Sequence, residues 1–231
     1  MEKQELRELV WNELERHGLA TFPRPAHGKI PNFVGSEKAA TKLRSIPAYQ
    51  KAKIIMVNPD AAQLAVRELA LLDRKKLLMA SPRLRKGFIL LDPAKIRNHR
   101  EAASIKGAFR HGAPVDIKGI KVDLIVEGSV AVDIKGGRLG KGGGFGDLEY
   151  AILRETSAAS ESTPIATTVH QLQIIESIPM TEHDAPVDFI VTPERVIGTE
   201  HKYKKPQRIF WELLSPKALK MMPILAEVKK R

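Results

Sequence analysis

Hydrophobic residues along this chain follow two patterns, one typical of amphipathic helices and one of buried strands. In residues 3–16 apolar side chains recur three or four positions apart, which predicts a helix that ends near Gly18. Its inward side chains are expected to be Leu6, Leu9, Val10 and Leu14. Short continuous apolar runs predict buried strands. These runs cover residues 54–57, 76–80, 88–91, 122–126, 130–133, 164–169 and 187–192.

Helical segments are predicted between several of these strands. They cover residues 36–45, 61–72 and 147–156, and Asp60 is placed to cap the second of them. Strands that alternate with helices predict a layered α/β fold on a mainly parallel sheet. In such sheets, ligands bind beyond the carboxyl ends of the strands, where the loops gather.

Composition narrows the class of protein. A chain of 231 residues with 43% hydrophobic content is long enough for one domain with a sizeable core. The absence of cysteine excludes disulfides, a thiolate nucleophile and a zinc–sulfur site. No apolar run approaches the roughly 18 residues of a membrane span, and the start of the chain is too charged for a signal peptide. We therefore expect a cytoplasmic protein without a membrane partner.

Positive charge is concentrated at the C-terminal end. The net charge is +11, and residues 202–231 hold nine lysines and arginines. We expect residues 1–200 to form the α/β domain and residues 201–231 a basic C-terminal extension. The extension could contact nucleic acid phosphates, but a solvated segment is the favoured interpretation. Phe210 and Trp211 are expected to anchor it onto the body rather than to stack on bases.

The run from Gly136 to Asp147 is the strongest candidate for chemistry. Glycines alternate there at positions 140, 142, 144 and 146, so the backbone can take positive φ angles and approach a ligand closely, while its N–H groups can surround an anion. Arg138 and Lys141 add positive charge, and Asp147 could hold Mg²⁺. The helix that follows would direct its N-terminal dipole at a bound phosphate.

Two common nucleotide-binding loops do not match this run. A Walker A motif needs Ser or Thr after its lysine, whereas Gly142 follows Lys141. The dinucleotide fingerprint also requires a strand, a glycine turn and a helix with a later acidic residue, and no segment supplies all of them. A flexible surface hairpin is the alternative interpretation of the glycine run taken alone.

Several phrases of the sequence together resemble the signature of the 5-formyltetrahydrofolate cyclo-ligase family. The resemblance spans roughly residues 3–198 and is strongest with a divergent cyclo-ligase-like branch. It rests on Val122–Val126, Val130–Asp133 and Gly137–Gly144, and on the shorter phrases Phe22-Pro23, Ile30–Phe33, Asn58–Asp60 and Val169-His170. The resemblance implies a three-layer α/β/α fold with a mixed, mainly parallel sheet. It also implies ATP- and Mg²⁺-dependent conversion of 5-formyltetrahydrofolate to 5,10-methenyltetrahydrofolate through a phosphorylated formyl group.

The same resemblance implies roles for individual residues. Arg138 and Lys141 are expected to be catalytic, and Asp147 and Asp184 to bind the metal. The expected ATP contacts are Lys3, Arg7, Arg138, Leu139, Gly140, Lys141, Gly142, Gly143, Gly144, Phe145 and Gly146. Lys3 and Arg7 lie four positions apart, so they share one helix face. A solvated helix face is the alternative for these two residues.

The residues at the family's substrate-binding positions differ from the family pattern. Phe145-Gly146 stands where the folate-active enzymes have paired tyrosines, and Ala61 stands where they have a glutamate. Asp60 and Phe145 are therefore the expected substrate contacts, with Asp60 as the substitute carboxylate. Two alternatives follow: a related ATP-dependent enzyme acting on another heterocycle, such as one in thiamine metabolism, and a non-catalytic RNA-binding protein on the same fold.

Four other residues carry weaker expectations. His183 beside Asp184 is a site candidate, whereas His170 is expected to be structural. His27 could line a pocket, although a non-site position is favoured. Arg83, at the end of a predicted strand, could bind an anion or form a surface salt bridge.

Overall fold

The computed structural model describes residues 1–230, so Arg231, one of the cations of the C-terminal extension, lies outside the described residues. The helices are α1 (Lys3–Arg16), α2 (Ser36–Lys42), α3 (Pro47–Lys51), α4 (Leu64–Leu72), α5 (His99–Ala103), α6 (Ile105–His111), α7 (Phe145–Glu155), α8 (Pro216–Met221) and α9 (Pro223–Lys229). The strands are β1 (Ile54–Val57), β2 (Lys76–Ala80), β3 (Phe88–Leu91), β4 (Ala113–Val115), β5 (Leu124–Glu127), β6 (Ala131–Val132), β7 (Arg138–Leu139), β8 (Ile165–Thr168), β9 (Phe189–Val191) and β10 (Val196–Gly198). Short 3-10 turns link several of them.

Eight strands form one mixed sheet in the order β10-β9-β8-β5-β1-β2-β3-β4. The five central strands, β9, β8, β5, β1 and β2, are parallel, while β10, β3 and β4 pair antiparallel at the two edges. The prediction of a mixed, mainly parallel sheet is therefore confirmed. Apolar runs without alternation fit this arrangement, because parallel strands are buried on both faces.

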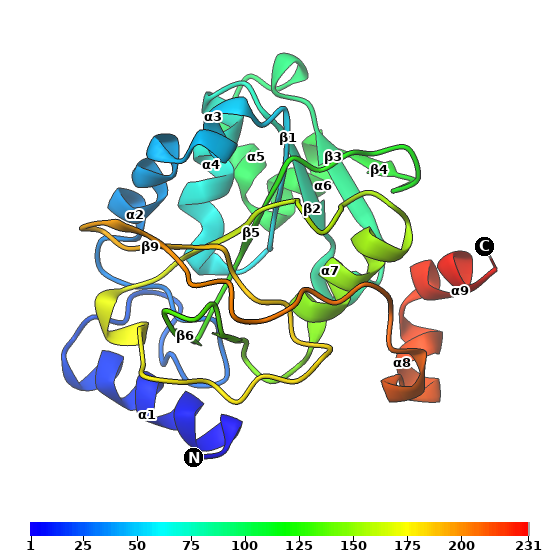
Figure 1. Cartoon of the computed structure of the whole chain (residues 1–231). Coiled ribbons are helices and arrows are strands. Elements are labelled where there is room, and N and C mark those ends of the chain that lie inside the picture. Colours follow the sequence, from blue (N-terminus) through cyan, green and yellow to red (C-terminus); the bar gives the residue numbers. More distant parts are fainter. Residues whose placement is uncertain (231) are drawn as a thin grey trace.

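Helices cover both faces of the sheet, which gives three layers (Figure 1). Side chains of α2 to α6 pack against one face, represented by Leu77 and Val126. The other face, which includes Leu78 and Ile125, is covered by α7 and by the C-terminal helix α9. A third apolar cluster joins α1 to the β6–β7 hairpin.

Helix α1 has the predicted bounds, but one inward residue was predicted wrongly. Leu9 is 45% exposed, whereas Trp11 is buried and donates its indole N–H to the carbonyl of Lys29 at 3.0 Å. Trp11 thus takes the inward position, because the buried stripe of α1 passes through Leu6, Val10, Trp11 and Leu14.

The glycine run begins within the β6–β7 hairpin and ends at α7. Helix α7 starts at Phe145, two residues before the predicted start, and Gly144 precedes it in the left-handed region with φ 65°. Gly142 also has a positive φ, of 101°, but Gly140 and Gly146 do not. Two of the four alternating glycines thus use the positive φ angles that glycine permits.

Asp60 does not cap the helix that follows β1, contrary to the prediction. Residues Ala61–Gln63 form a 3-10 turn, α4 begins at Leu64, and the Asp60 side chain accepts no capping hydrogen bond. The buried Arg67 instead fixes this turn by donating to the carbonyls of Asn58 at 2.5 Å and Asp60 at 2.9 Å. The Asp60 carboxylate is thereby left to face the glycine loop.

The C-terminal extension packs back onto the body beside α7 (Figure 1). Ile209 is fully buried, and Ile224, Leu225 and Val228 of α9 join the apolar cluster that contains Tyr150. Trp211 packs against the same cluster, which confirms that it is an anchor.

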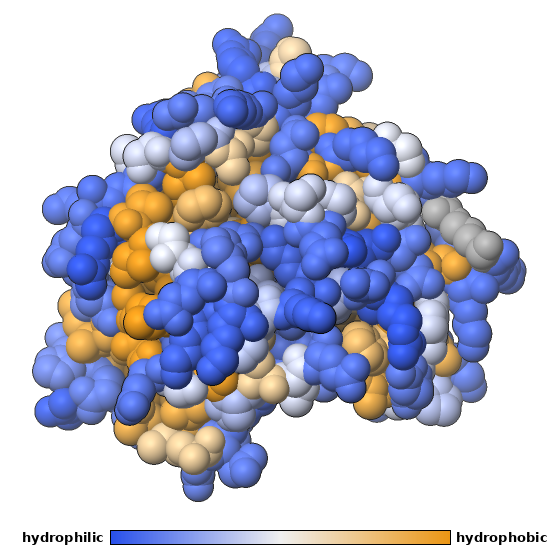
Figure 2. Space-filling view, in the orientation of Figure 1, coloured by the Kyte–Doolittle hydropathy of each residue, from blue (hydrophilic) through white to orange (hydrophobic). Residues whose placement is uncertain are grey.

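Most of the molecular surface that Figure 2 shows is hydrophilic. Within residues 1–230, no helix combines the length and the apolar character that crossing a membrane requires.

Candidate active site

The candidate site lies at the carboxyl ends of the adjacent parallel strands β1 and β5. Asn58 follows β1 and Gly128 follows β5, and the Asn58 side chain joins both to α7. Its Oδ1 accepts from the Gly128 N–H at 2.8 Å, and its Nδ2 donates to Glu149 Oε2 at 2.7 Å. The glycine loop crosses this edge, as expected for a ligand site in a parallel sheet.

A first cavity, of 510 Å³, extends from α1 to α8. At one end it is lined by Lys3 and Arg7 together with Gly140, Gly142, Gly143 and Gly144. At the other end the wall is apolar. That wall is formed by Leu148, Ala151, Phe210, Leu213, Leu214 and Met222.

A second cavity, of 650 Å³, shares part of the glycine loop with the first. Its wall combines the turn after β1, the turn after β2 and the start of α7. The polar and charged residues in it are Asn58, Asp60, Arg83, Arg138, Lys141, Asp147 and Glu149. Six residues line both cavities: Arg138, Gly140, Gly143, Gly144, Phe145 and Asp147.

Arg138 stands between the two cavities with its guanidinium buried. It forms ion pairs with Glu127, at 3.1 Å from Nε to Oε2, and with Asp147, through Nη2. Nε directs its hydrogen to the carbonyl of Ala185, so the contact with Glu127 is an ion pair without a hydrogen bond. Burial works against the charge of Arg138, but the two carboxylates outweigh it and raise its pKa. The guanidinium is therefore a fixed positive charge.

Helix α1 brings Lys3 and Arg7, which share one face, to the first cavity. Lys3 Nζ donates to Asp184 Oδ2 at 2.5 Å, and Arg7 Nε donates to the carbonyl of Gly140 at 2.7 Å. A Cβ on Gly142 would lie 3.4 Å from the Arg7 guanidinium carbon. Position 142 therefore favours glycine for two reasons: its positive φ and the closeness of the Arg7 side chain.

Asp147 and Asp184 offer a donor set suited to Mg²⁺. Asp147 uses Oδ1 to accept from Arg138 and from the Ala185 N–H, and Asp184 uses Oδ2 to accept from Lys3 and Thr181. Within the described residues, Asp147 Oδ2 accepts no hydrogen bond. One or two carboxylates plus phosphate oxygens and water are the usual ligands of this cation. Among residues 1–230 no cluster of three or more acidic or histidine side chains is placed to bind a metal, so phosphates would have to complete the site.

Lys141 extends from the loop into the second cavity rather than into the first. Its Nζ lies 2.6 Å from Asp60 Oδ1, and the lysine side chain is 40% exposed. The pair joins the loop to the turn after β1 over a gap of 81 residues in sequence. The two residues that the sequence assigned separately to catalysis and to substrate binding are therefore neighbours.

Two buried glutamates in this region were missed by sequence reasoning. Glu127 ends β5 and is fully buried, and neither carboxylate oxygen accepts a hydrogen bond from residues 1–230. Burial raises its pKa to about 7, against the opposing charge of Arg138. Burial also raises the pKa of Glu149 well above its ordinary value, with Glu127 and Asp60 adding to that effect. A glutamate that ends the run Leu124-Ile125-Val126 was the available signal for Glu127.

Gly146 has a steric role rather than a conformational one. A Cβ at this position would lie 3.1 Å from Glu127 Oε2 and 3.4 Å from Arg138 Nη1. Close approach of the buried ion pair thus explains glycine in the first turn of α7, where its φ is ordinary.

The four weaker candidates fall into separate places. His183 lines the first cavity beside Asp184. His170 Nδ1 accepts from the Leu172 N–H at 3.2 Å, which supports its structural role. His27 contacts Asn12 and Trp11 on α1 and lines neither cavity. Arg83 lines the second cavity with a φ of 57°, and no salt bridge to it is present in the described part of the chain.

Comparisons with known proteins agree on one family. The model of the 5-formyltetrahydrofolate cyclo-ligase family matches residues 1–193. A methenyltetrahydrofolate synthase domain-containing protein of Bos taurus is 42% identical over 235 residues, covering 98% of this chain and 62% of that protein. A 5-formyltetrahydrofolate cyclo-ligase of Escherichia coli (strain K12) is 30% identical over 90 residues, covering 37% of this chain and 47% of that protein. The chain thus spans less than two thirds of the length of the first of these relatives.

Similarity to a solved structure supports the fold. The NMR structure of a 5,10-methenyltetrahydrofolate synthetase from Aquifex aeolicus superposes with a TM-score of 0.54 at 22% identity. The superposition covers 91% of this chain and 98% of that one. The three-layer arrangement is therefore shared across nearly the full length of the smaller protein.

Proposed function

This chain belongs to the 5-formyltetrahydrofolate cyclo-ligase family, and from that premise we propose that it converts 5-formyltetrahydrofolate to 5,10-methenyltetrahydrofolate with ATP as phosphoryl donor. The observation that carries the proposal is the shared wall of the two cavities, made by the glycine loop, Arg138, Phe145 and Asp147. A donor in one cavity and an acceptor in the other would meet at this wall. Positioning and charge neutralisation are the main requirements of phosphoryl transfer.

ATP is assigned to the first cavity. Lys3 and Arg7 stand at the same end of this cavity as the loop, where positive charge favours a polyphosphate. Gly142 and Gly144 expose the loop backbone, and α7 begins directly after Gly144. The N-terminus of this 11-residue helix adds a partial positive charge. These groups support the loop as the phosphate-binding element.

The folate is assigned to the second cavity, where Asp60, Arg83 and Lys141 line the wall. In the proposed reaction the bond between the γ-phosphorus and ADP breaks as a bond forms to the formyl oxygen. N10 of the folate then attacks the formyl carbon and gives its proton to a base, and the carbon–oxygen bond breaks to release phosphate. Lys141 lines the second cavity and directly follows Gly140, which lines both cavities. We therefore assign its ammonium to stabilise negative charge on the group in transfer.

We assign Mg²⁺ to Asp147 and Asp184, whose carboxylate oxygens fit a hard cation. Bound Mg²⁺ would neutralise the charge of the ATP phosphates. Lys3 would hold Asp184 in place through their 2.5 Å ion pair, and Arg138 would do the same for Asp147.

A second candidate is a related ATP-dependent enzyme acting on another heterocycle. The cavity wall supports it, because Ala61 and Gly146 lack the polar groups that the folate-active pattern has there, while Asp60 adds a carboxylate. A ring system with more hydrogen-bond donors would suit such a wall.

The first test is ADP release by the full chain with ATP and Mg²⁺, with and without 5-formyltetrahydrofolate. We expect release only when the folate is present. Release that does not depend on the folate, or ATP binding without folate-dependent release, would favour the second candidate.

A further inference from the structure

We propose that the C-terminal extension is part of the nucleotide site: residues Phe210–Met222 form the wall against which the nucleobase packs. This inference rests on the proposed binding of ATP in the first cavity. It gives the extension a function that differs from nucleic acid binding. The wall lies beyond residue 193, where the match to the family model ends.

The geometry of the first cavity is that of a site for an amphiphilic ligand. Its anionic-ligand end consists of α1 cations and the glycine loop, which together offer Lys3, Arg7 and backbone N–H groups. Its opposite end consists of apolar side chains from two sources. Leu148 and Ala151 come from α7, and Phe210, Leu213, Leu214, Ala218 and Met222 come from the extension. ATP is divided in the same way, because its triphosphate is charged and its base is a flat, uncharged ring.

The extension is held in place by burial on both sides of this wall. Ile209 is fully buried before it, and Ile224 and Leu225 are buried after it. The Ile209 N–H also donates to Glu155 Oε2 of α7 at 2.9 Å. Between these anchors, Leu213 is 59% exposed, which leaves its side chain available at the cavity.

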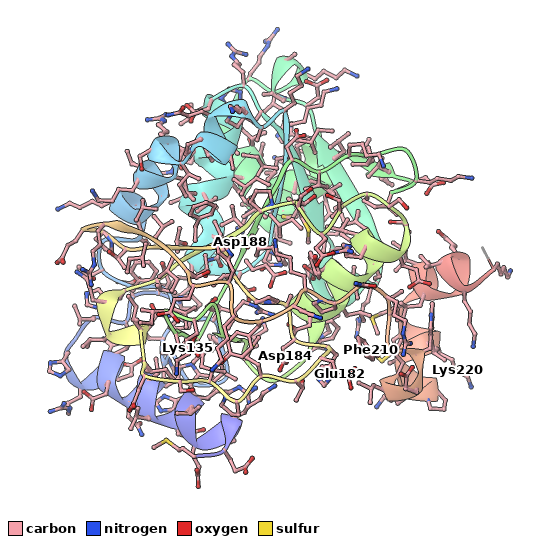
Figure 3. All side chains as sticks on the ribbon, in the orientation of Figure 1. Lys135, Glu182, Asp184, Asp188, Phe210 and Lys220 are labelled. Atoms are coloured by element: carbon pink, nitrogen blue, oxygen red, sulfur yellow. The ribbon has the colours of Figure 1, made fainter. Side chains whose placement is uncertain are left out.

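Phe210 is oriented by two polar neighbours. The Arg208 guanidinium lies 4.7 Å from the ring centroid, and the His183 ring makes an edge contact at 6.1 Å. Figure 3 shows Phe210 between the segment that carries Glu182 and Asp184 and the helix that carries Lys220. The ring thus stands at the junction of the apolar wall and the Asp184 segment, where a nucleoside joins its phosphates.

Isothermal titration of the full chain with Mg²⁺–ATP and with Mg²⁺–tripolyphosphate tests the proposal. Phe210→Ala and Leu213→Ala should each weaken ATP binding about tenfold, since stacking and apolar contact with a base contribute on this scale. Affinity for tripolyphosphate should change by less than about twofold, because that ligand has no base. Leu72→Ala is the matched control: Leu72 is an exposed leucine, 53% accessible, at the end of α4 on the other face of the sheet.

Each outcome of this experiment decides the matter. ATP affinity unchanged in both wall variants overturns the proposal and leaves the proposed function intact. An equal loss for ATP and tripolyphosphate also overturns it, because the wall would then act through the phosphate end. If the unaltered chain binds tripolyphosphate but gains nothing from the nucleoside of ATP, the nucleobase wall is wrong. If it binds neither ligand, the proposed function fails as well.

Discussion

Among individual residues, Glu127 has the most unusual environment. It is fully buried at the end of a central strand, beside the buried Arg138 and without a hydrogen-bond donor to either oxygen in residues 1–230. Sequence reasoning proposed Arg138, Lys141 and Asp147 from the resemblance and from charge in a glycine-rich run, and Asp184 from the resemblance. It missed Glu127 because the partners of a strand-end carboxylate come from distant parts of the chain.

Stability should fall as pH rises, and Glu127 should account for part of the slope. Its folded pKa of about 7 exceeds the ordinary value of 4.5, so the native state binds more protons between these values. The free energy of unfolding therefore begins to fall above pH 4.5, and the fall due to Glu127 is complete above pH 7. It amounts to about 3 kcal/mol, at about 1.36 kcal/mol per pKa unit. Denaturant unfolding across this range should show a smaller slope for Glu127→Gln. Glu149 contributes with the same sign, so some slope remains.

The exposed Glu176→Gln is the matched control and should leave the slope unchanged. An equal pH slope in the Glu127→Gln variant and the unaltered chain would show that Glu127 does not titrate in this range.

Lys141 should act on turnover more than on ATP affinity. We expect Lys141→Met to lower kcat about 100-fold, the scale of a lost electrostatic contact to the reacting group. The dissociation constant of ATP should change less than about threefold, because Lys141 lines only the second cavity. Since the ion pair with Asp60 is exposed on the lysine side, stability should change by less than about 1 kcal/mol. A large loss of ATP affinity with normal turnover would place Lys141 on the nucleotide instead.

At the scale of elements, the sequence predicted the central strands and α1 well, because their apolar periodicity reflects burial directly. The prediction was less accurate where contacts between distant segments determine the conformation of the backbone. The turn after β1 is fixed by Arg67, and the early start of α7 brings Gly146 against Glu127. Neither contact can be read from local sequence. The β6–β7 hairpin also continues into residues that the sequence placed in the loop.

The packing of α7 against the end of β5 should disfavour a side chain at position 146. Gly146→Ala would place a Cβ 3.1 Å from Glu127 Oε2, and we expect a destabilisation of about 1–3 kcal/mol. Gly198→Ala is the matched control, since its Cβ meets open space, and it should be nearly neutral. Chemical denaturation measures both variants, and equal stability of the two would contradict the steric account of Gly146.

Asp184, which Lys3 of α1 contacts, should affect the Mg²⁺ concentration that activity requires. Asp184→Asn should raise the Mg²⁺ concentration for half-maximal activity at saturating ATP, because one carboxylate ligand is lost. Hydrogen bonds from Lys3 and Thr181 outweigh burial and hold the pKa of Asp184 below its ordinary value, so the group is ionised at neutral pH. A Mg²⁺ titration identical to that of the unaltered chain would remove Asp184 from the metal site.

For the whole molecule, the basic extension is the part whose role the sequence left most open. Its packing onto α7 and its place in the wall of the first cavity support a structural and nucleotide-binding role. Several of its cations are also engaged within the chain: Lys205 pairs with Asp188 at 2.6 Å, and Arg208 with Glu212 at 3.0 Å. RNA binding through this segment stays a hypothesis. Its boundary at residue 200 likewise stays a proposal, since Ile209 and α9 share the core of the body.

The measurement that tests the central claim most directly is the ultraviolet absorbance of 5,10-methenyltetrahydrofolate after the full chain is mixed with ATP, Mg²⁺ and 5-formyltetrahydrofolate. ADP is quantified in the same samples. We predict ATP-dependent formation of the product, one molecule for each ADP released, which would also show that Phe145, Gly146 and Ala61 are compatible with folate. ATP binding without any such product would contradict the cyclo-ligase assignment and would indicate a different substrate in the second cavity.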